Sequence, residues 1–425
     1  MDAKWKNGCV CLMMAAAGLL AKPVVKVSVD KEGAVYECGE LAVFKVVVSD
    51  DEGGELPASA DFRLTNDNLA VLKTGTLDLS ASSEFTMSET MEVPGFLNLS
   101  VVCNYTDQDG SAKNVKGVAA AGFSPTEIRM AAQPPLNFME YWKGEMKRAD
   151  LLAPMEPVVE KLEKYSNENH TSYKVTFEAI DDIVYGYLNI PAKPGPRPAI
   201  VYVPGAGPGH SAPLEDNEFV TLVMNVHPFD PFIENKPVGM YMFNGGNSRE
   251  ATFYHRVIIG IARAIEWLAN RPEVDSARIG YYGSSQGGAF GLIEAGLTGR
   301  FAAVVCNVPA MCDHFGADLG RRPGWPSYRN HFMTKDAEGN SVHDSVSEAW
   351  IPYYDAAAFA GFIQCPIRVI VGFIDDTCSP SSVYAAFNAI PSEDKTMIHE
   401  IDMGHATRNS FWGDAVTWMK GVITK

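Results

Sequence analysis

The chain has 425 residues, of which 46% are hydrophobic and 20% charged, an ordinary globular composition that excludes a wholly disordered or collagen-like protein. With 35 basic and 52 acidic residues the formal net charge is −17 at pH 7, which disfavours binding to nucleic acids and to anionic membrane surfaces. Eight cysteines are too few for a disulfide scaffold, and at roughly 150 residues per domain the length predicts two or three domains.

Residues 1–22 have the pattern of a cleaved export signal. Two lysines precede an apolar run at 9–21, which is too short to span a bilayer comfortably. The run carries its cysteines at its start rather than its end, which disfavours a lipid anchor. We therefore expect a protein without a membrane anchor that is exported to the periplasm or outside a bacterial cell. The alternative is an N-terminal helix that belongs to the fold.

Residues 23–122 alternate apolar and polar side chains in short runs that turn-rich pieces separate. This pattern predicts an all-β sandwich of immunoglobulin type, acting as an accessory domain. Binding of carbohydrate is a second possible role for it. Cys38 and Cys103 fall in this region. Export would permit a disulfide between them, and two small buried side chains are the alternative.

Residues 123–170 predict a helical linker region that packs on the domain after it. The pair Pro134 and Pro135 marks its boundary, and residues 137–165 are predicted to be helical with a break at Pro154.

From residue 171 to 425 the pattern alternates strands with helices. Residues 173–180 and 183–190 predict an antiparallel pair, and Ser248 can cap a helix that runs to Asn270. Continuous apolar runs predict strands that are buried on both faces. These strands lie at 198–204, 220–226, 277–283, 301–308 and 367–373, with a last one at 396–401. Such alternation predicts an α/β domain whose mostly parallel sheet is flanked by helices.

The strongest chemical signal is Gly283-Ser284-Ser285-Gln286-Gly287, a G-x-S-x-G motif between a predicted strand and a predicted helix. Its glycines allow close chain approach at a sharp strand-to-helix turn that projects the central serine above the sheet. We therefore predict that Ser285 is a nucleophile. The alternative is a turn of small residues that packs a helix on the sheet.

A serine hydroxyl needs a base at neutral pH, and in α/β-hydrolases the chain order is serine, acid, histidine. Asp375 follows the strand at 367–373 and His405 follows the last strand, so both lie at the strand edge that carries Ser285. Asp376 and His399 compete for these roles. We prefer Asp375 for its position close to the strand end, and His405 because His399 lies inside the strand.

An oxyanion hole needs two backbone N–H donors. We predict that these donors are the backbone N–H of Gln286, which follows the nucleophile, and the backbone N–H of Ala206, which lies in the glycine-rich residues 204–209. A phosphate-binding loop is disfavoured because no Lys-Ser/Thr pair follows these glycines. We expect no metal and no other cofactor.

From about residue 135 onward the chain resembles the acetyl xylan esterase/cephalosporin C deacetylase family of α/β-hydrolases. The segments that carry the resemblance are 137–142, 262–288, 308–313 and 353–388. The resemblance implies an α/β-hydrolase fold and places the family's serine, acid and histidine on Ser285, Asp375 and His405. The chain departs from the family at Val226-His227-Pro228-Phe229, where Arg-Gly-Gln is usual, and at Ala406, where a glutamate usually follows the histidine.

The resulting hypothesis is an exported serine esterase that removes acetyl groups from saccharides such as xylan or xylo-oligosaccharides. Trp325, Tyr328 and Tyr254 are candidates for a sugar-binding platform, although core packing is an alternative for each. A homo-oligomer is possible, since members of the resembled family form closed assemblies. Other functions considered are a serine peptidase, an esterase for a non-carbohydrate substrate, and a catalytically weak glycan-binding protein.

Overall fold

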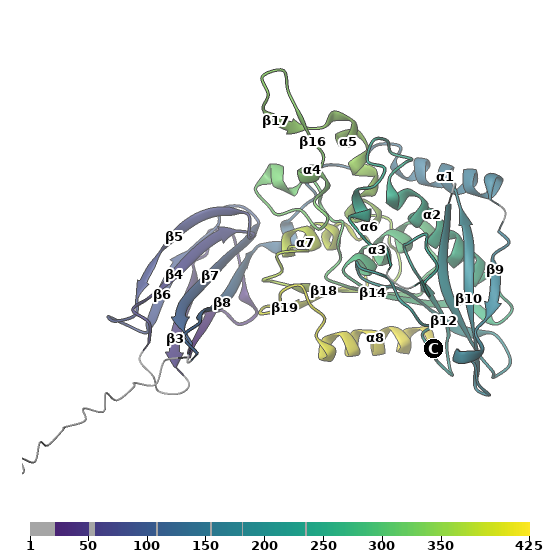
Figure 1. Cartoon of the computed structure of the whole chain (residues 1–425), viewed down its shortest axis with the longest axis horizontal. Helices are drawn as coiled ribbons and strands as arrows, with labels where there is room; N and C mark the ends of the chain where they lie inside the picture. The colour runs from purple at the N-terminus through teal and green to yellow at the C-terminus, as the bar shows by residue number, and fades with distance from the viewer. Residues whose placement is uncertain (1–21, 51–55, 108, 154, 181, 234–235) are drawn as a thin grey trace, which may run out of the picture.

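The computed structural model describes residues 22–425 except for 51–55, 108, 154, 181 and 234–235 (Figure 1). The predicted export signal therefore lies outside the described residues, apart from Lys22. A β-sandwich packs against one end of a larger α/β unit (Figure 1). In the part of the chain that the structure describes, no helix is long and apolar enough to cross a membrane.

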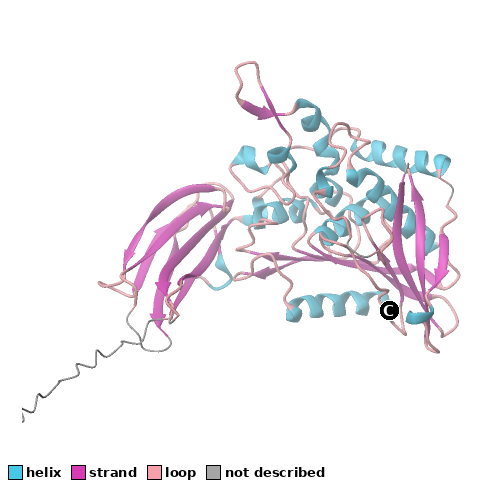
Figure 2. Cartoon of the chain, viewed as in Figure 1, coloured by secondary structure: helices cyan, strands magenta, loops and turns pink. Residues whose placement is uncertain are grey.

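The predicted β-sandwich is confirmed as two sheets that face each other (Figure 2). In the described residues one sheet has the strand order β1-β3-β6 and the other has the order β2-β8-β7-β4-β5. The core between them includes Phe44, Leu64 and Leu99, all fully buried by the alternation of inward and outward side chains. The strands are β1 (Pro23–Val29), β2 (Val35–Tyr36), β3 (Ala42–Asp50), β4 (Ser59–Asn66), β5 (Ala70–Asp78), β6 (Glu84–Glu89), β7 (Gly95–Thr106) and β8 (Ala112–Phe123).

The cysteines of the sandwich do not form a disulfide. Cys38 and Cys103 are both free thiols, and Cys103 is fully buried in the core between the sheets. The structure therefore supports packing as small side chains, the alternative to a disulfide.

The region predicted as a helical linker is only half helical. Helix α1 (Phe138–Leu152) forms as expected, but the residues after it form the short strand β9 (Val158–Lys161), which pairs antiparallel with β10. The predicted helix is wrong for the residues of β9, because Pro157 lacks the N–H that a continuing helix requires. The exposed edge of the sheet then offers unpaired backbone groups to the β-branched pair Val158 and Val159.

The α/β unit is built on one mixed sheet. Its strand order in the described residues is β19-β18-β15-β14-β12-β13-β11-β10-β9, and the six strands from β19 to β13 in this order are parallel. The predicted antiparallel pair is confirmed as β10 and β11, which extend the parallel part. The remaining strands are β10 (His170–Ala179), β11 (Asp182–Pro191), β12 (Arg197–Val203), β13 (Val220–Met224), β14 (Val274–Ser284), β15 (Ala303–Asn307), β18 (Ile367–Gly372) and β19 (Lys395–Glu400), with the separate hairpin β16 (Met333–Lys335) and β17 (Ser341–His343).

Helices cover both faces of this sheet, as predicted. Figure 1 shows α8 on one face and α1, α2, α3, α6 and α7 on the other. The helices are α2 (Phe253–Ala269), α3 (Gln286–Thr298), α4 (Tyr328–His331), α5 (Ser345–Trp350), α6 (Ala356–Ala360), α7 (Pro380–Ala389) and α8 (Asn409–Ile423). The predicted start of α2 at Ser248 is wrong, because residues 244–253 form a loop that the Phe253 N–H closes by donating to the Asn244 carbonyl, at 2.9 Å. The Ser248 hydroxyl accepts from the N–H of Ala251 inside this loop, at 3.2 Å.

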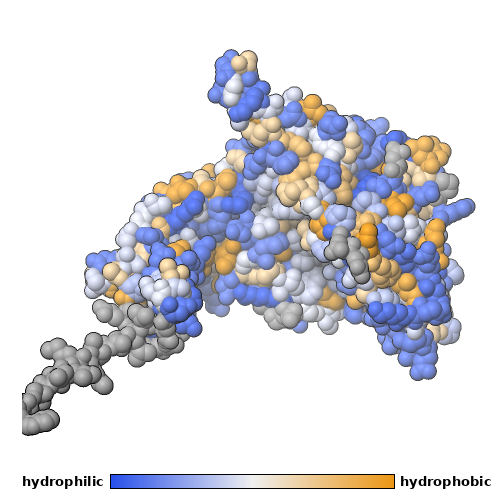
Figure 3. All heavy atoms as spheres, viewed as in Figure 1, coloured by the Kyte–Doolittle hydropathy of each residue, from blue (hydrophilic) through white to orange (hydrophobic). Residues whose placement is uncertain are grey.

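The visible surface is mostly hydrophilic with scattered hydrophobic residues (Figure 3). Burial is concentrated in two apolar cores, one inside the sandwich and one around the large sheet. Phe96 of β7 belongs to the second core although its strand is in the sandwich, so the two units share a packed contact.

Candidate active site

The turn between β14 and α3 holds Ser285 in a strained conformation. Its φ and ψ are 58° and −120°, a combination that L-residues rarely adopt and that the surrounding packing must enforce. A Cβ on Gly287 would lie 1.9 Å from the carbonyl oxygen of Val203, and one on Gly283 would lie 2.4 Å from that of Gly287. The two motif glycines therefore allow the chain to pass close enough to form the turn.

Ser285, His405 and Asp375 lie in one hydrogen-bonded row. The imidazole Nε2 of His405 is 2.9 Å from Ser285 Oγ, and its Nδ1 is 2.9 Å from Asp375 Oδ2. Asp375 is fully buried, and its Oδ1 accepts from the backbone N–H groups of Thr377 and Cys378, at 2.8 and 2.9 Å. These two bonds fix the carboxylate, which leaves Oδ2 for the N–H of the histidine.

The competing residues have other partners. Asp376 has an exposed side chain, and its carbonyl oxygen accepts from the guanidinium of Arg322, at 3.0 Å. His399 lies within β19, and its Nε2 contacts the Tyr384 hydroxyl. The structure therefore places Asp375 and His405 at Ser285, and not the two alternatives.

Asn307 is a site residue that the sequence analysis missed. It ends β15, is almost fully buried, and donates from Nδ2 to Ser284 Oγ at 2.7 Å and to the Ala406 carbonyl at 3.0 Å. A third contact joins this Nδ2 to Thr407 Oγ1, at 3.0 Å. The side chain therefore ties the serine turn to the residues after His405. Its signal in the sequence is a polar residue at the end of an otherwise apolar strand.

Residues 401–408, here called the histidine loop, are also held by their own arginine. Arg408 donates to the carboxylate of Asp402 at 2.7 Å and to that of Glu400 at 3.1 Å. Glu400 is almost fully buried, which raises its pKa, and the nearby Arg408 guanidinium opposes that shift. Glu400 therefore supports the loop from the strand.

The side chain of Gln286 is clamped by two tyrosines. The hydroxyls of Tyr241 and Tyr254 both donate to its Oε1, each at 2.6 Å. These bonds hold the first turn of α3. This helix begins at Gln286, whose backbone N–H is the predicted oxyanion donor.

The prediction of a sugar-binding platform is wrong for two of its three candidate residues, because both are buried. Tyr254 is fully buried against Gln286, and Tyr328 is 1% exposed between His314 and Trp350. Neither ring can reach a substrate at the surface in this structure. Their apolar surroundings make them core side chains.

Residues 204–209, here called the oxyanion loop after the donor predicted at Ala206, follow β12, and Ala206 is exposed. The loop approaches the nucleophile, since a Cβ on Gly205 would lie 3.8 Å from Ser285 Cβ. His227, one of the departures from the family pattern, fixes its middle by a 2.6 Å contact from Nε2 to the Gly207 carbonyl. Burial lowers the pKa of His227, so the neutral ring donates this bond from its N–H.

A sequence profile described as acetyl xylan esterase (AXE1) matches residues 126–421. The chain belongs to the acetyl xylan esterase family. This esterase is 28% identical over 406 residues to the acetyl esterase Axe7A of Xylanibacter ruminicola, a match that covers 91% of the chain and 88% of the relative. Membership of this family shows that the protein is a hydrolase of the serine α/β-hydrolase type.

Solved structures agree on the fold of the esterase. Acetyl xylan esterase 1 from a Thermoanaerobacterium species superposes with a TM-score of 0.59 at 22% identity, covering 70% of this chain and 97% of that one. Acetyl xylan esterase from a Paenibacillus species gives a TM-score of 0.57 at 20% identity, covering 70% of this chain and 98% of that one. The α/β-hydrolase fold expected from the sequence is confirmed.

Trp325 remains the candidate substrate-binding residue of the esterase. It is half-buried, and its backbone N–H donates to the carbonyl of Thr377, at 3.0 Å. The backbone N–H of Thr377 also donates to the carboxylate of Asp375, so the backbone of Trp325 is bonded to the segment that fixes the candidate acid.

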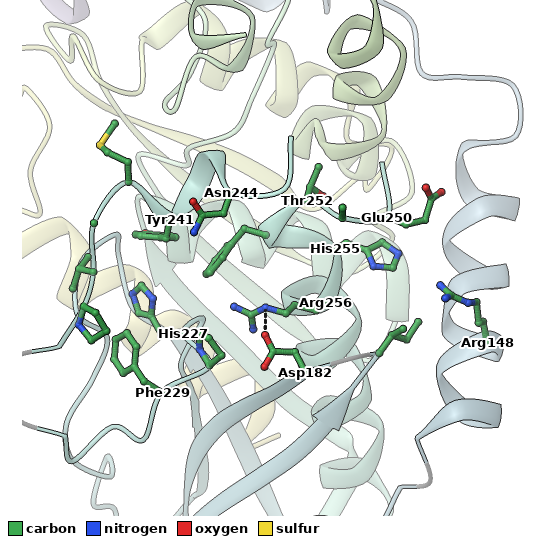
Figure 4. Close-up of a pocket in the computed structure, with 18 residues that line it drawn as sticks. Arg148, Asp182, His227, Phe229, Tyr241, Asn244, Glu250, Thr252, His255 and Arg256 are labelled. Atoms are coloured by element: carbon green, nitrogen blue, oxygen red, sulfur yellow. Dashed lines mark ion pairs between the residues drawn. The ribbon is translucent and has the colours of Figure 1, made fainter. Parts of the chain in front are cut away.

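A cavity of about 760 Å³ lies beside the site of the esterase (Figure 4). Its lining includes His227 and Tyr241, the side chains that hold the oxyanion loop and Gln286, but no member of the Ser-His-Asp row. The dashed pair in Figure 4 joins Arg256 to Asp182 at 2.8 Å. The cavity therefore adjoins two side chains that hold Gly207 and Gln286.

Proposed function

We propose that this protein is a serine esterase that removes acetyl groups from acetylated saccharides, xylan or xylo-oligosaccharides, through an acyl-enzyme. The observation that carries the proposal is the hydrogen-bonded row of Ser285, His405 and Asp375 in a member of the acetyl xylan esterase family.

In the first half of the reaction His405 Nε2 takes the proton of Ser285 while Oγ attacks the acetyl carbonyl carbon. The carbonyl π electrons move to oxygen, and the backbone N–H groups of Gln286 and Ala206 stabilise that negative charge. Asp375 holds the imidazole through Nδ1–H and stabilises its charged form. The tetrahedral intermediate then expels the sugar alkoxide, which takes the proton from His405 and leaves as an alcohol.

In the second half water replaces the sugar. His405 removes a proton from the water as its oxygen attacks the acetyl-serine ester, and the second tetrahedral intermediate releases acetate. Ser285 recovers its proton from His405, so the residues return to their starting state.

The carbohydrate part of the proposal rests on the family and on the relative named as an acetyl esterase. The net charge of −17 suits a neutral acetylated glycan better than a polyanion. Trp325 is the proposed contact for a sugar ring, since aromatic faces bury apolar sugar surface.

The decisive test is Ser285→Ala, assayed with p-nitrophenyl acetate and with acetylated xylo-oligosaccharides. We expect kcat to fall by roughly four to six orders of magnitude, because no other group replaces the nucleophile. Ser341→Ala, in the exposed hairpin strand β17, is the matched control and should retain full activity. Near-normal turnover by the Ser285 variant would overturn the mechanism.

The substrate is tested by measuring acetate release from acetylated xylan, xylo-oligosaccharides, other acetylated glycans and cephalosporin C. Short peptide amides complete the panel. We expect the highest kcat/KM on a xylo-oligosaccharide. Preference for a peptide amide or for cephalosporin C would overturn the saccharide assignment.

We further propose that the enzyme acts in the periplasm or outside a bacterial cell, since residues 1–22 have the pattern of an export signal. Cell fractionation tests this, and activity retained in the cytoplasm would contradict it. A homo-oligomer is proposed from the family resemblance alone, and the mass in solution tests it.

A further inference from the structure

The turn between β4 and β5 of the sandwich reaches into the α/β unit. Asp67 and Asn68 form it with φ values of 49° and 55°, in the left-handed region that aspartate and asparagine tolerate best among residues with a Cβ. Asp67 is fully buried, and its backbone N–H donates to the carbonyl of Phe96 on β7, at 2.7 Å. The carboxylate is therefore fixed to the sandwich by its own backbone.

That carboxylate binds two segments of the α/β unit. Asp67 Oδ2 accepts from the backbone N–H of Arg322 at 2.7 Å and from the hydroxyl of Ser381, in the first turn of α7. Residues 375–379, here called the acid loop, connect β18 to α7, so Ser381 lies just beyond their C-terminal end.

Arg322 then extends the contact into the acid loop. Its guanidinium donates to the carbonyl of Asn68 at 2.5 Å and to that of Asp376 at 3.0 Å. Its own carbonyl accepts from the hydroxyl of Ser379, at 2.5 Å. The loop is therefore linked to the sandwich next to Asp375 and at its last residue.

A second contact holds the strand that enters the acid loop. Asn98 donates from Nδ2 to the carbonyl of Phe373, at 3.2 Å. The ring of Phe96 meets that of Phe373 edge-on, with centroids 5.1 Å apart, and also packs on Tyr384. The sandwich therefore contacts the chain before Asp375 directly, and it is linked to the chain after Asp375 through Arg322.

We propose that Asp67 is a positioning residue, through which the sandwich fixes the acid loop and keeps Asp375 aligned with His405. This inference rests on the proposed Ser-His-Asp mechanism and gives the sandwich a part in catalysis. The physical reason is geometric, since a displacement of about 1 Å in a reacting constellation can cost roughly a hundredfold in rate.

The test compares Asp67→Gly with Asp67→Asn. Glycine accepts the left-handed backbone without strain and removes the carboxylate, whereas asparagine keeps both the backbone preference and an acceptor oxygen. Asp30→Gly is the matched control. Asp30 is also a sandwich aspartate with two hydrogen bonds, from the Tyr36 hydroxyl at 2.7 Å and the Val43 N–H at 2.9 Å, both inside the sandwich.

The readout is kcat and KM for p-nitrophenyl acetate in the full-length chain, divided by the number of serines that a fluorophosphonate titrates. For Asp67→Gly we expect kcat per titrated serine to fall roughly tenfold with KM unchanged, since the Asp67 carboxylate contacts Arg322 and Ser381 and acts only through the acid loop. Asp67→Asn should recover to within about twofold of the parent, and Asp30→Gly should match the parent.

Three outcomes would overturn the inference: an unchanged kcat per titrated serine in Asp67→Gly, an equal loss in Asp30→Gly, or no recovery in Asp67→Asn. A loss confined to the number of titrated serines would show a folding role only, and it also overturns the inference. Failure of the underlying mechanism is seen separately, as parent enzyme that the fluorophosphonate does not label at Ser285 or as activity that survives Ser285→Ala.

Discussion

The serine and the acid of the site are supported by different parts of the chain. Ser285 is held by its neighbours in sequence, Gly283 and Gly287, and by Asn307, the end of the adjacent strand. Asp375 is fixed by Thr377 and Cys378, but the loop that carries it is gripped by the sandwich, about 300 residues earlier. The turn that carries the serine is therefore encoded mainly in a local motif, whereas the loop that carries the acid is also held by a tertiary contact with the sandwich.

Removing the charge of the acid is the most severe way to break the acid side of this comparison. Asp375→Asn keeps the shape of the side chain but presents an amide that cannot hold the same imidazole tautomer. We expect kcat for p-nitrophenyl acetate to fall by about four orders of magnitude.

Asp376→Asn is the control for that variant, since the Asp376 side chain is exposed and only its carbonyl binds Arg322. It should keep the parent kcat. A comparable loss in the two variants would contradict the assignment of Asp375.

Breaking the support on the serine side should cost less, because the reacting groups remain. Asn307→Ala removes three contacts, to Ser284, Ala406 and Thr407, and so frees the histidine loop from the serine turn. We expect kcat to fall roughly tenfold to a hundredfold at unchanged KM.

Asn270→Ala removes an asparagine that caps α2 and bonds the Glu266 carbonyl at 2.8 Å, away from the site. Its kcat should equal that of the parent. This result would show that the loss in Asn307→Ala comes from the contacts of Asn307 and not from removing any hydrogen-bonded asparagine. Full activity in Asn307→Ala would show that the histidine loop holds itself through Arg408.

The smallest expected effect concerns pH and stability at the sandwich contact. Burial raises the pKa of Asp67 to about 7, against the opposing hydrogen bonds from Ser381 and Arg322 and the charges of Arg321 and Arg322. The folded chain then keeps a proton that the unfolded chain releases above about pH 4. This group contributes stability below about pH 4, and the contribution is lost as the pH rises to about 7.

Asp67→Asn removes that titration. We expect the melting temperatures of the parent and the variant to be closest near pH 4. Between about pH 4 and pH 7 the melting temperature of the variant should rise relative to that of the parent. Thermal unfolding at a series of pH values checks this. A difference between the two proteins that does not change with pH would contradict the raised pKa.

The sequence predicted the parts of the site that depend on local patterns. The G-x-S-x-G motif between a strand and a helix marks Ser285, and positions after the last two strands mark Asp375 and His405, because parallel strands bring their carboxyl ends to one edge. The same patterns predicted both the sandwich and the large sheet. They misplaced the start of α2, because a closed loop precedes Phe253, and they missed β9, because pairing at a sheet edge outweighed helical spacing.

Only the tertiary structure decided which side chains support these residues. The sequence left Tyr254 and Tyr328 open between a sugar-binding platform and core packing, and the tertiary structure buries both. Nothing near Asp67 in the sequence marks it as a partner of Arg322 and Ser381. The physical reason is that periodicity reports which face of an element is apolar, whereas contacts between distant segments depend on how whole sheets and loops pack together.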